Sequence, residues 1–122
     1  MKICLLKEDF ILSRRNSLII LKTYKVLKNY NDREVNAKLL ELNPSLQCVQ
    51  RNYFELSVTL MNKFGYYNQK LDFQYDPVTS DLIKKLLEEQ DDVLDKLTLL
   101  VEKTKCFENL RTELRLLIYN LR

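Results

Sequence analysis

Leucine and glycine stand in an extreme ratio in this chain: 25 of the 122 residues are leucine, and Gly65 is the sole glycine. Isoleucine and valine together number 13. Leucine keeps most of its rotamer freedom in a helix whereas β-branched residues lose it, so this composition favours helices over strands. We therefore expect an all-α fold of four to five helices, forming an antiparallel hairpin or bundle within one domain over residues 1–122.

The residues that most enzyme and cofactor sites need are missing. The chain has no histidine, which excludes Ser-His and Cys-His nucleophile pairs and imidazole metal ligands. One glycine cannot supply the glycine-rich loops that cradle dinucleotides or nucleotide phosphates. Cys4, Cys48 and Cys106 are too widely spaced to indicate a zinc site or a disulfide framework. We expect no enzyme activity, no catalytic or metal-binding residues and no cofactor.

Apolar runs are short throughout the sequence. The longest contain four residues, such as Ile3–Leu6, whereas a membrane-spanning helix needs about 20. The same N-terminal run is too short for a signal peptide. We expect an intracellular protein, cytoplasmic or nuclear, without a membrane span.

Positive charge is concentrated at the beginning of the chain. Residues 1–30 hold seven Lys or Arg and two acidic residues, whereas residues 31–80 hold five and six and residues 81–122 hold eight and nine. The basic end could meet nucleic acid or an acidic partner. Because its charges are dispersed among leucine and isoleucine, we favour a solvated helix face over a nucleic-acid contact.

Periodic apolar residues predict a basic helix within residues 1–30. Leu12, Ile19 and Val26 recur every seven residues. Glu8 and Asp9 would then lie in the first turn, where carboxylates interact favourably with the helix dipole. The spacing indicates a helix over about 8–29.

Residues 31–65 are predicted to form a pair of helices. Asn31 and Glu34 have the spacing of a capping box, so a short helix should run from there to Leu42. Asn43 and Pro44 then have the residue types of a cap and a first helical position. A second helix should follow over 44–64 and end at Gly65.

Aromatic residues crowd into the segment that follows, predicted to be a loop over 66–79. Alternating apolar and polar residues over 71–76 leave open whether part of it is a strand. Tyrosine-rich surfaces are common at interface hot spots, and an extended segment can add to a partner's sheet edge. The predicted partner-binding residues here are Phe64, Tyr66, Tyr67, Phe73 and Tyr75.

Residues 80–122 carry a leucine seam that predicts one long coiled-coil-like helix or a pair of helices. The seam shifts register between Thr104 and Phe107, where three residues replace the expected four. A helix of about 41 residues would outrun the helix over 44–64, which favours a partner on the uncovered part. The predicted partner-binding residues of the seam are Leu94, Leu97, Val101, Phe107, Leu110, Leu114 and Leu117.

An acidic string, Asp91-Asp92-Val93-Leu94-Asp95, lies within this seam. In prenyl-transferring enzymes such a string on a helix binds magnesium, which holds a diphosphate. Those enzymes also need a deep apolar cavity and a second acidic motif, and this chain has neither the length nor that motif. We interpret the carboxylates as the solvated flank of the seam.

These features together favour a non-enzymatic subunit of an intracellular multiprotein complex. It would bind other protein subunits, as a hetero- or homo-oligomer, through coiled-coil or bundle packing. An alternative is a compact helical-bundle adaptor or inhibitor that captures a partner's amphipathic helix in a groove. A basic nucleic-acid-binding module is a third, less favoured possibility.

Overall fold

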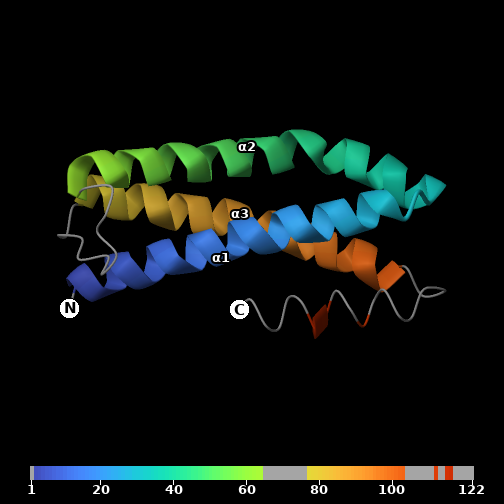
Figure 1. Ribbon diagram of the computed structural model, residues 1–122, viewed down its shortest axis with the longest axis horizontal. Coiled ribbons are helices and arrows are strands. Elements are labelled where there is room, and N and C mark those ends of the chain that lie inside the picture. The colour runs from blue at the N-terminus through green and yellow to red at the C-terminus, as the bar shows by residue number, and fades with distance from the viewer. Residues whose placement is uncertain (1, 65–76, 104–111, 113–114, 117–122) are drawn as a thin grey trace.

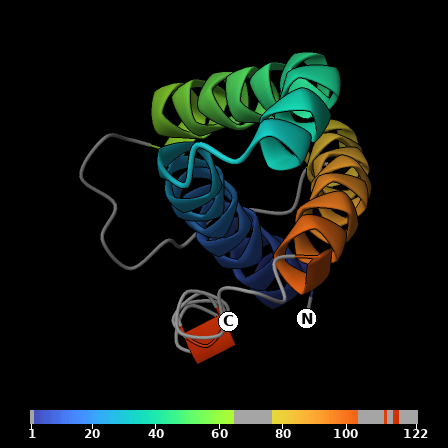
Figure 2. The same cartoon turned by 90° about the vertical axis from the view of Figure 1, so that its right-hand side faces the viewer.

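The computed structural model is an all-α protein and describes residues 2–64, 77–103, 112, 115 and 116. Within those residues it contains three helices: α1 (Lys2–Asn29), α2 (Arg33–Phe64) and α3 (Pro77–Lys103). Helix α2 runs antiparallel to α1, and α3 returns in the direction of α1 (Figure 1). The three helices contact one another pairwise and form a bundle (Figure 2). The predicted all-α class is confirmed, but the prediction of four to five helices is not.

Helix α1 is longer than the sequence predicted. It begins at Lys2 rather than near Glu8 and ends, as predicted, at Asn29. Ile19 is fully buried, whereas Leu12, which shares its predicted stripe, is 41% exposed. Ile20 and Leu27, whose spacing widens the predicted stripe, are buried with Ile19.

In the turn between α1 and α2, the residue that caps the start of α2 differs from the predicted one. Asn31 has a positive φ of 54°, which asparagine tolerates better than most residues. Asp32 is the cap instead, because its carboxylate accepts a hydrogen bond from the Val35 backbone N–H at 3.1 Å. The predicted capping role of Asn31 is wrong by one residue.

Pro44 lies inside α2, so the predicted pair of helices over 31–65 is one continuous helix. Proline cannot donate to the Leu40 carbonyl, and its ring crowds that carbonyl, at a cost of about 3 kcal/mol. Buried apolar residues stand on both sides of it, including Leu42 and Leu46. Burying each leucine contributes roughly 1.5–3 kcal/mol, so together they outweigh the proline. The helix continues with a bend, which Figure 1 shows in the first half of α2.

Helix α3 begins at Pro77, where a first-turn proline loses no helical hydrogen bond, rather than at Ser80. It ends at Lys103. Beyond it, Arg115 forms an ion pair with Glu102. The predicted long helix or helix pair over 80–122 falls partly on residues 104–111, 113–114 and 117–122, which lie outside the described part.

The core consists of two apolar clusters. The larger one combines residues such as Ile19, Leu46 and Leu97 from all three helices. The smaller one, toward the start of α1 and the end of α2, contains Phe10, Leu56, Leu60, Ile83 and Leu86.

A buried polar layer lies between the two clusters. The Gln90 amide donates a hydrogen bond to the Ser13 carbonyl at 3.0 Å, and the Asn16 amide donates to the Gln90 side-chain oxygen at 3.4 Å. Gln90 is completely buried, and Asn16 is 2% exposed. Each of these amides needs a partner in the interior, so the pairing fixes how α1 and α3 align.

Candidate functional site

The seam residues predicted to bind a partner pack inside the protein where the structure describes them. Leu94, Leu97 and Val101 are 3%, 1% and 2% exposed and belong to the larger cluster, against α1 and α2. Their own chain therefore covers the surface that the sequence left without a neighbour. The other predicted contacts lie outside the residues whose side chains are described: Phe64, Tyr66, Tyr67, Phe73, Tyr75, Phe107, Leu110, Leu114 and Leu117.

The acidic string lies on the outer face of α3. Asp91, Asp92 and Asp95 are exposed, and Asp92 forms an ion pair with Lys96 at 3.1 Å. Among the side chains described, those of residues 8–62 and 77–103 with 112, 115 and 116, no three acidic or cysteine groups lie closely enough together to hold a metal ion. The helices described are also too short or too polar to cross a membrane.

A groove lies between α2 and α3 among the described residues, and its first section lies beside Pro44. This section has a volume of about 310 Å³. Leu42 and Leu100 form its apolar floor, and both are nearly buried. Leu99, at the outer rim, is 62% exposed, although nothing polar in its side chain favours water. An exposed leucine above an apolar floor is the arrangement that a partner's apolar side chain would cover.

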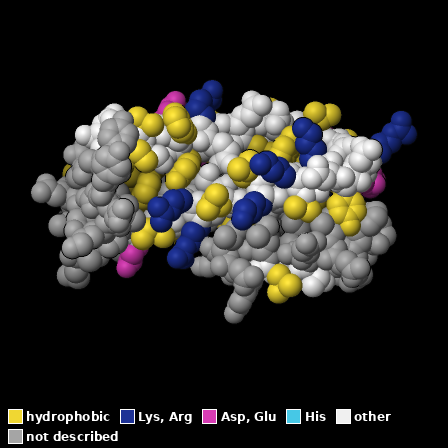
Figure 3. Space-filling view, viewed as in Figure 1, with side chains coloured by type: hydrophobic (Ala, Val, Ile, Leu, Met, Phe, Trp, Pro, Cys, Tyr) yellow, Lys and Arg dark blue, Asp and Glu magenta, His cyan; other side chains and the backbone are white. Residues whose placement is uncertain are grey.

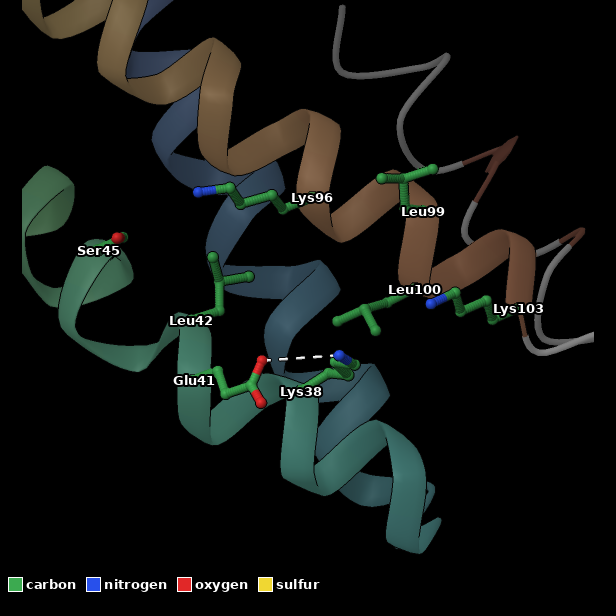
Figure 4. Close-up of a pocket in the computed structure, with 8 residues that line it drawn as sticks. All are labelled: Lys38, Glu41, Leu42, Ser45, Lys96, Leu99, Leu100 and Lys103. Carbon is green, nitrogen blue, oxygen red and sulfur yellow. Dashed lines mark ion pairs between the residues drawn. The ribbon is translucent and has the colours of Figure 1, made fainter.

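Three lysines surround this section of the groove: Lys38 from α2, and Lys96 and Lys103 from α3. Lys38 and Lys103 point to either side of Leu100 (Figure 4). Among the described residues that line this section, Glu41 is the only carboxylate, and its oxygen lies 3.7 Å from the Lys38 ammonium. Lys96 is paired with Asp92, which lies outside the lining, so the described lining itself holds three lysines and one carboxylate. We call it the basic section.

A second section of the groove lies further along the same two helices, with a volume of about 240 Å³. Its charged lining residues are Glu55 and Glu89, with Lys85 as the one cation. Leu82 stands at this section and is half exposed. Asn52 donates a hydrogen bond to the Glu89 carboxylate at 3.0 Å and so ties α2 to α3 here. We call it the acidic section.

The bend at Pro44 explains why the basic section stays open. Its α2 residues, Lys38 through Ser45, straddle the proline. Where a helix bends, it cannot stay in contact with a straight neighbour along its whole length. The side chains that α2 and α3 place at the outer rim are then separated from each other, while Leu42 and Leu100 still pack below them.

Sequence reasoning missed this groove, although one signal was available. Lys96, Leu99 and Lys103 recur at steps of three and four, so they share one face of α3. Leu99 lies far from the buried stripe through Leu97 and Val101. The sequence alone could therefore have predicted an exposed leucine on the charged face of α3. The opposing wall from α2 was not predictable, because the break expected at Pro44 separated its residues into two helices.

No protein-family model, curated protein or solved structure matches this chain. The function must therefore be argued from the groove and from the surfaces around it.

Proposed function

We propose that this protein is a non-enzymatic interaction module that binds an amphipathic helix of another protein in the groove between α2 and α3. The basic section carries the proposal, because it combines an apolar floor, the exposed Leu99 and three lysines. A helix with leucines on one face and carboxylates beside them would satisfy both features.

The two sections together define the charge pattern of the partner helix. The α2 residues that line the two sections begin at Lys38 and end at Thr59, which lie about 32 Å apart along the helix at 1.5 Å per residue. A partner helix of roughly 21 residues would reach from one section to the other. Its carboxylates would face Lys96 and Lys103 at one end, and its cations would face Glu55 and Glu89 at the other.

We propose that the partner helix contacts this groove and not the leucine seam of α3. Leu94, Leu97 and Val101 are already covered, so exposing them to a partner would first require opening the bundle. Leu99 and Leu82 need no such opening, because both are exposed in the folded protein. The groove therefore supports the adaptor class of function, in which a folded monomer receives a helix. The partner can still be a subunit of a larger complex.

A synthetic peptide tests the groove. The probe is a fluorescein-labelled, 21-residue amphipathic helix with leucines along one face, glutamates flanking them in one half and lysines in the other. A comparison peptide has the same composition with glutamate and lysine alternating along its length. We expect fluorescence anisotropy to show saturable binding of the first peptide and weaker binding of the second.

Two double variants locate the contact. Lys96→Glu/Lys103→Glu should weaken binding of the segregated peptide at least tenfold, because carboxylates would then oppose carboxylates. The matched control, Lys22→Glu/Lys25→Glu on α1, changes net charge equally and should leave the affinity unchanged. Leu99→Ser should also weaken binding. Absence of saturable binding, or an equal loss in both double variants, would contradict the proposal.

The oligomeric state separates this proposal from an obligate subunit. An adaptor that receives a helix in a preformed groove should sediment as a monomer and unfold in a single cooperative transition. Self-association of the purified chain would instead favour packing between copies.

A further inference from the structure

The outward face of α1 carries charges of one sign beyond Phe10. Between Phe10 and Asn29, α1 carries five basic residues and no acidic one. All five side chains are exposed, and none lines the groove between α2 and α3. They are Arg14, Arg15, Lys22, Lys25 and Lys28.

Exposed leucines stand among these cations. Leu18 and Leu21 are each about two-fifths exposed, and they share the outward face with Lys22 and Lys25. Figure 3 shows Lys and Arg side chains with hydrophobic ones between them across the middle of this face, and Asp and Glu toward its edges. The face thus combines apolar surface with five positively charged side chains along about four turns of helix.

A hollow of about 300 Å³ adjoins this face, between α1 and α2. Its lining includes Leu21 and Tyr24 from α1 and Leu46 from α2, and no charged side chain. The Lys28 ammonium lies 5.8 Å from the centre of the Tyr24 ring, at the edge of this region. Asn43, Gln47 and Gln50 also line this hollow. Its apolar side chains can contact part of an apolar chain while the neighbouring cations hold an anionic group.

We propose that the outward face of α1 binds the surface of a bilayer that contains anionic lipids. Lysine and arginine attract anionic headgroups, while leucines between them enter the boundary with the acyl chains. Basic side chains suit this position because their alkyl stems lie along apolar surface and their charges reach the headgroups. A nucleic acid would engage the cations alone and leave Leu18 and Leu21 without a role. The inference is independent of the groove, since it uses another face.

Sedimentation with sucrose-loaded vesicles tests this proposal on the full chain. The vesicles are phosphatidylcholine alone, or phosphatidylcholine with 30% phosphatidylserine. We expect binding to the anionic vesicles only, and weaker binding as salt is raised, because salt screens the headgroup charge. The variant Lys22→Glu/Lys25→Glu should lower the partition coefficient at least tenfold, since each basic residue contributes about fivefold.

Two further variants distinguish a bilayer from other anionic partners. Leu18→Ser/Leu21→Ser keeps every charge and should lower vesicle binding severalfold, because it removes only the apolar contact. The control Lys96→Glu/Lys103→Glu, in the groove, should bind vesicles like the parent after circular dichroism has shown that each variant is folded. The proposal would be overturned if the groove control lost vesicle binding equally or if the parent protein failed to bind anionic vesicles. It would also be overturned if the protein were retained on duplex DNA or RNA and this retention survived Leu18→Ser/Leu21→Ser.

Discussion

Replacing Gln90 with leucine tests what the buried polar layer contributes. Leucine has nearly the volume of glutamine, so the substitution opens no large cavity. It removes the acceptor of the Asn16 amide, at 3.4 Å, and the donor to the Ser13 carbonyl, at 3.0 Å. The Asn16 side chain is 2% exposed, so water cannot replace the lost partner.

The size of the effect follows from that burial. Leaving a buried amide without a hydrogen-bond partner costs about 1–3 kcal/mol. We expect Gln90→Leu to lower the free energy of unfolding by that amount, and Asn16→Leu to do so similarly, since it leaves the Gln90 oxygen without its donor. In the double variant both amides are gone and the two apolar clusters can join. Its free energy of unfolding should return to within about 1 kcal/mol of the parent.

Urea unfolding followed by circular dichroism at 222 nm measures all three variants. The interaction energy from the double-mutant cycle should be at least about 1 kcal/mol. Gln47→Leu, at an exposed position of α2, is the matched control and should change stability by less than about 0.5 kcal/mol. Strictly additive single effects, or a Gln90→Leu protein as stable as the parent, would show that these hydrogen bonds carry no coupling between α1 and α3.

Three other substitutions test the bend in α2, the cap at its start and a partly buried carboxyl group in α1. Pro44→Ala should raise the free energy of unfolding by up to about 3 kcal/mol in a urea titration, because it restores a helical N–H. The same variant should weaken peptide binding, measured by fluorescence anisotropy, because it straightens α2. Tighter peptide binding would refute the role of the bend. Asp32→Ala removes the cap of α2 and should cost about 0.5–2 kcal/mol in thermal or urea unfolding, whereas an unchanged stability would refute the cap. Burial raises the pKa of Asp9 above its ordinary 3.8, and the nearby Lys84 offsets part of this rise. Ionised Asp9 therefore disfavours folding above the raised pKa, and this penalty is lost as the pH falls through that pKa toward 3.8. Asp9→Asn should accordingly be more stable than the parent at pH 7 and equally stable at pH 3, and a larger gap at pH 3 would contradict the sign.

Local sequence signals predicted the buried faces and two of the helix ends. Ile19 is buried as its spacing predicted, and α2 ends at Phe64, just before Gly65, as expected. Such features depend on a few neighbouring residues, which the sequence displays directly. Their agreement with the structure follows from the 3.6-residue period of the helix.

Features that depend on competition between distant residues were not predictable. Pro44 is a strong local stop signal, but leucines on both sides of it pack against α1 and α3, and their burial outweighs the local cost. The same long-range packing covers Leu94, Leu97 and Val101, which looked available from the seam alone. The groove is missed for the same reason, because its walls come from helices about 55 residues apart in the chain.

The polar layer of Ser13, Asn16 and Gln90 also determines how this bundle can deform. It interrupts the apolar contacts, so a rearrangement in one cluster is not transmitted through continuous side-chain packing to the other. The basic section of the groove rests on Leu42 and Leu100, which belong to the larger cluster. Phe10, Leu60 and Ile83 belong to the smaller cluster, so a substitution among them would reach the basic section only through the polar layer or the backbone.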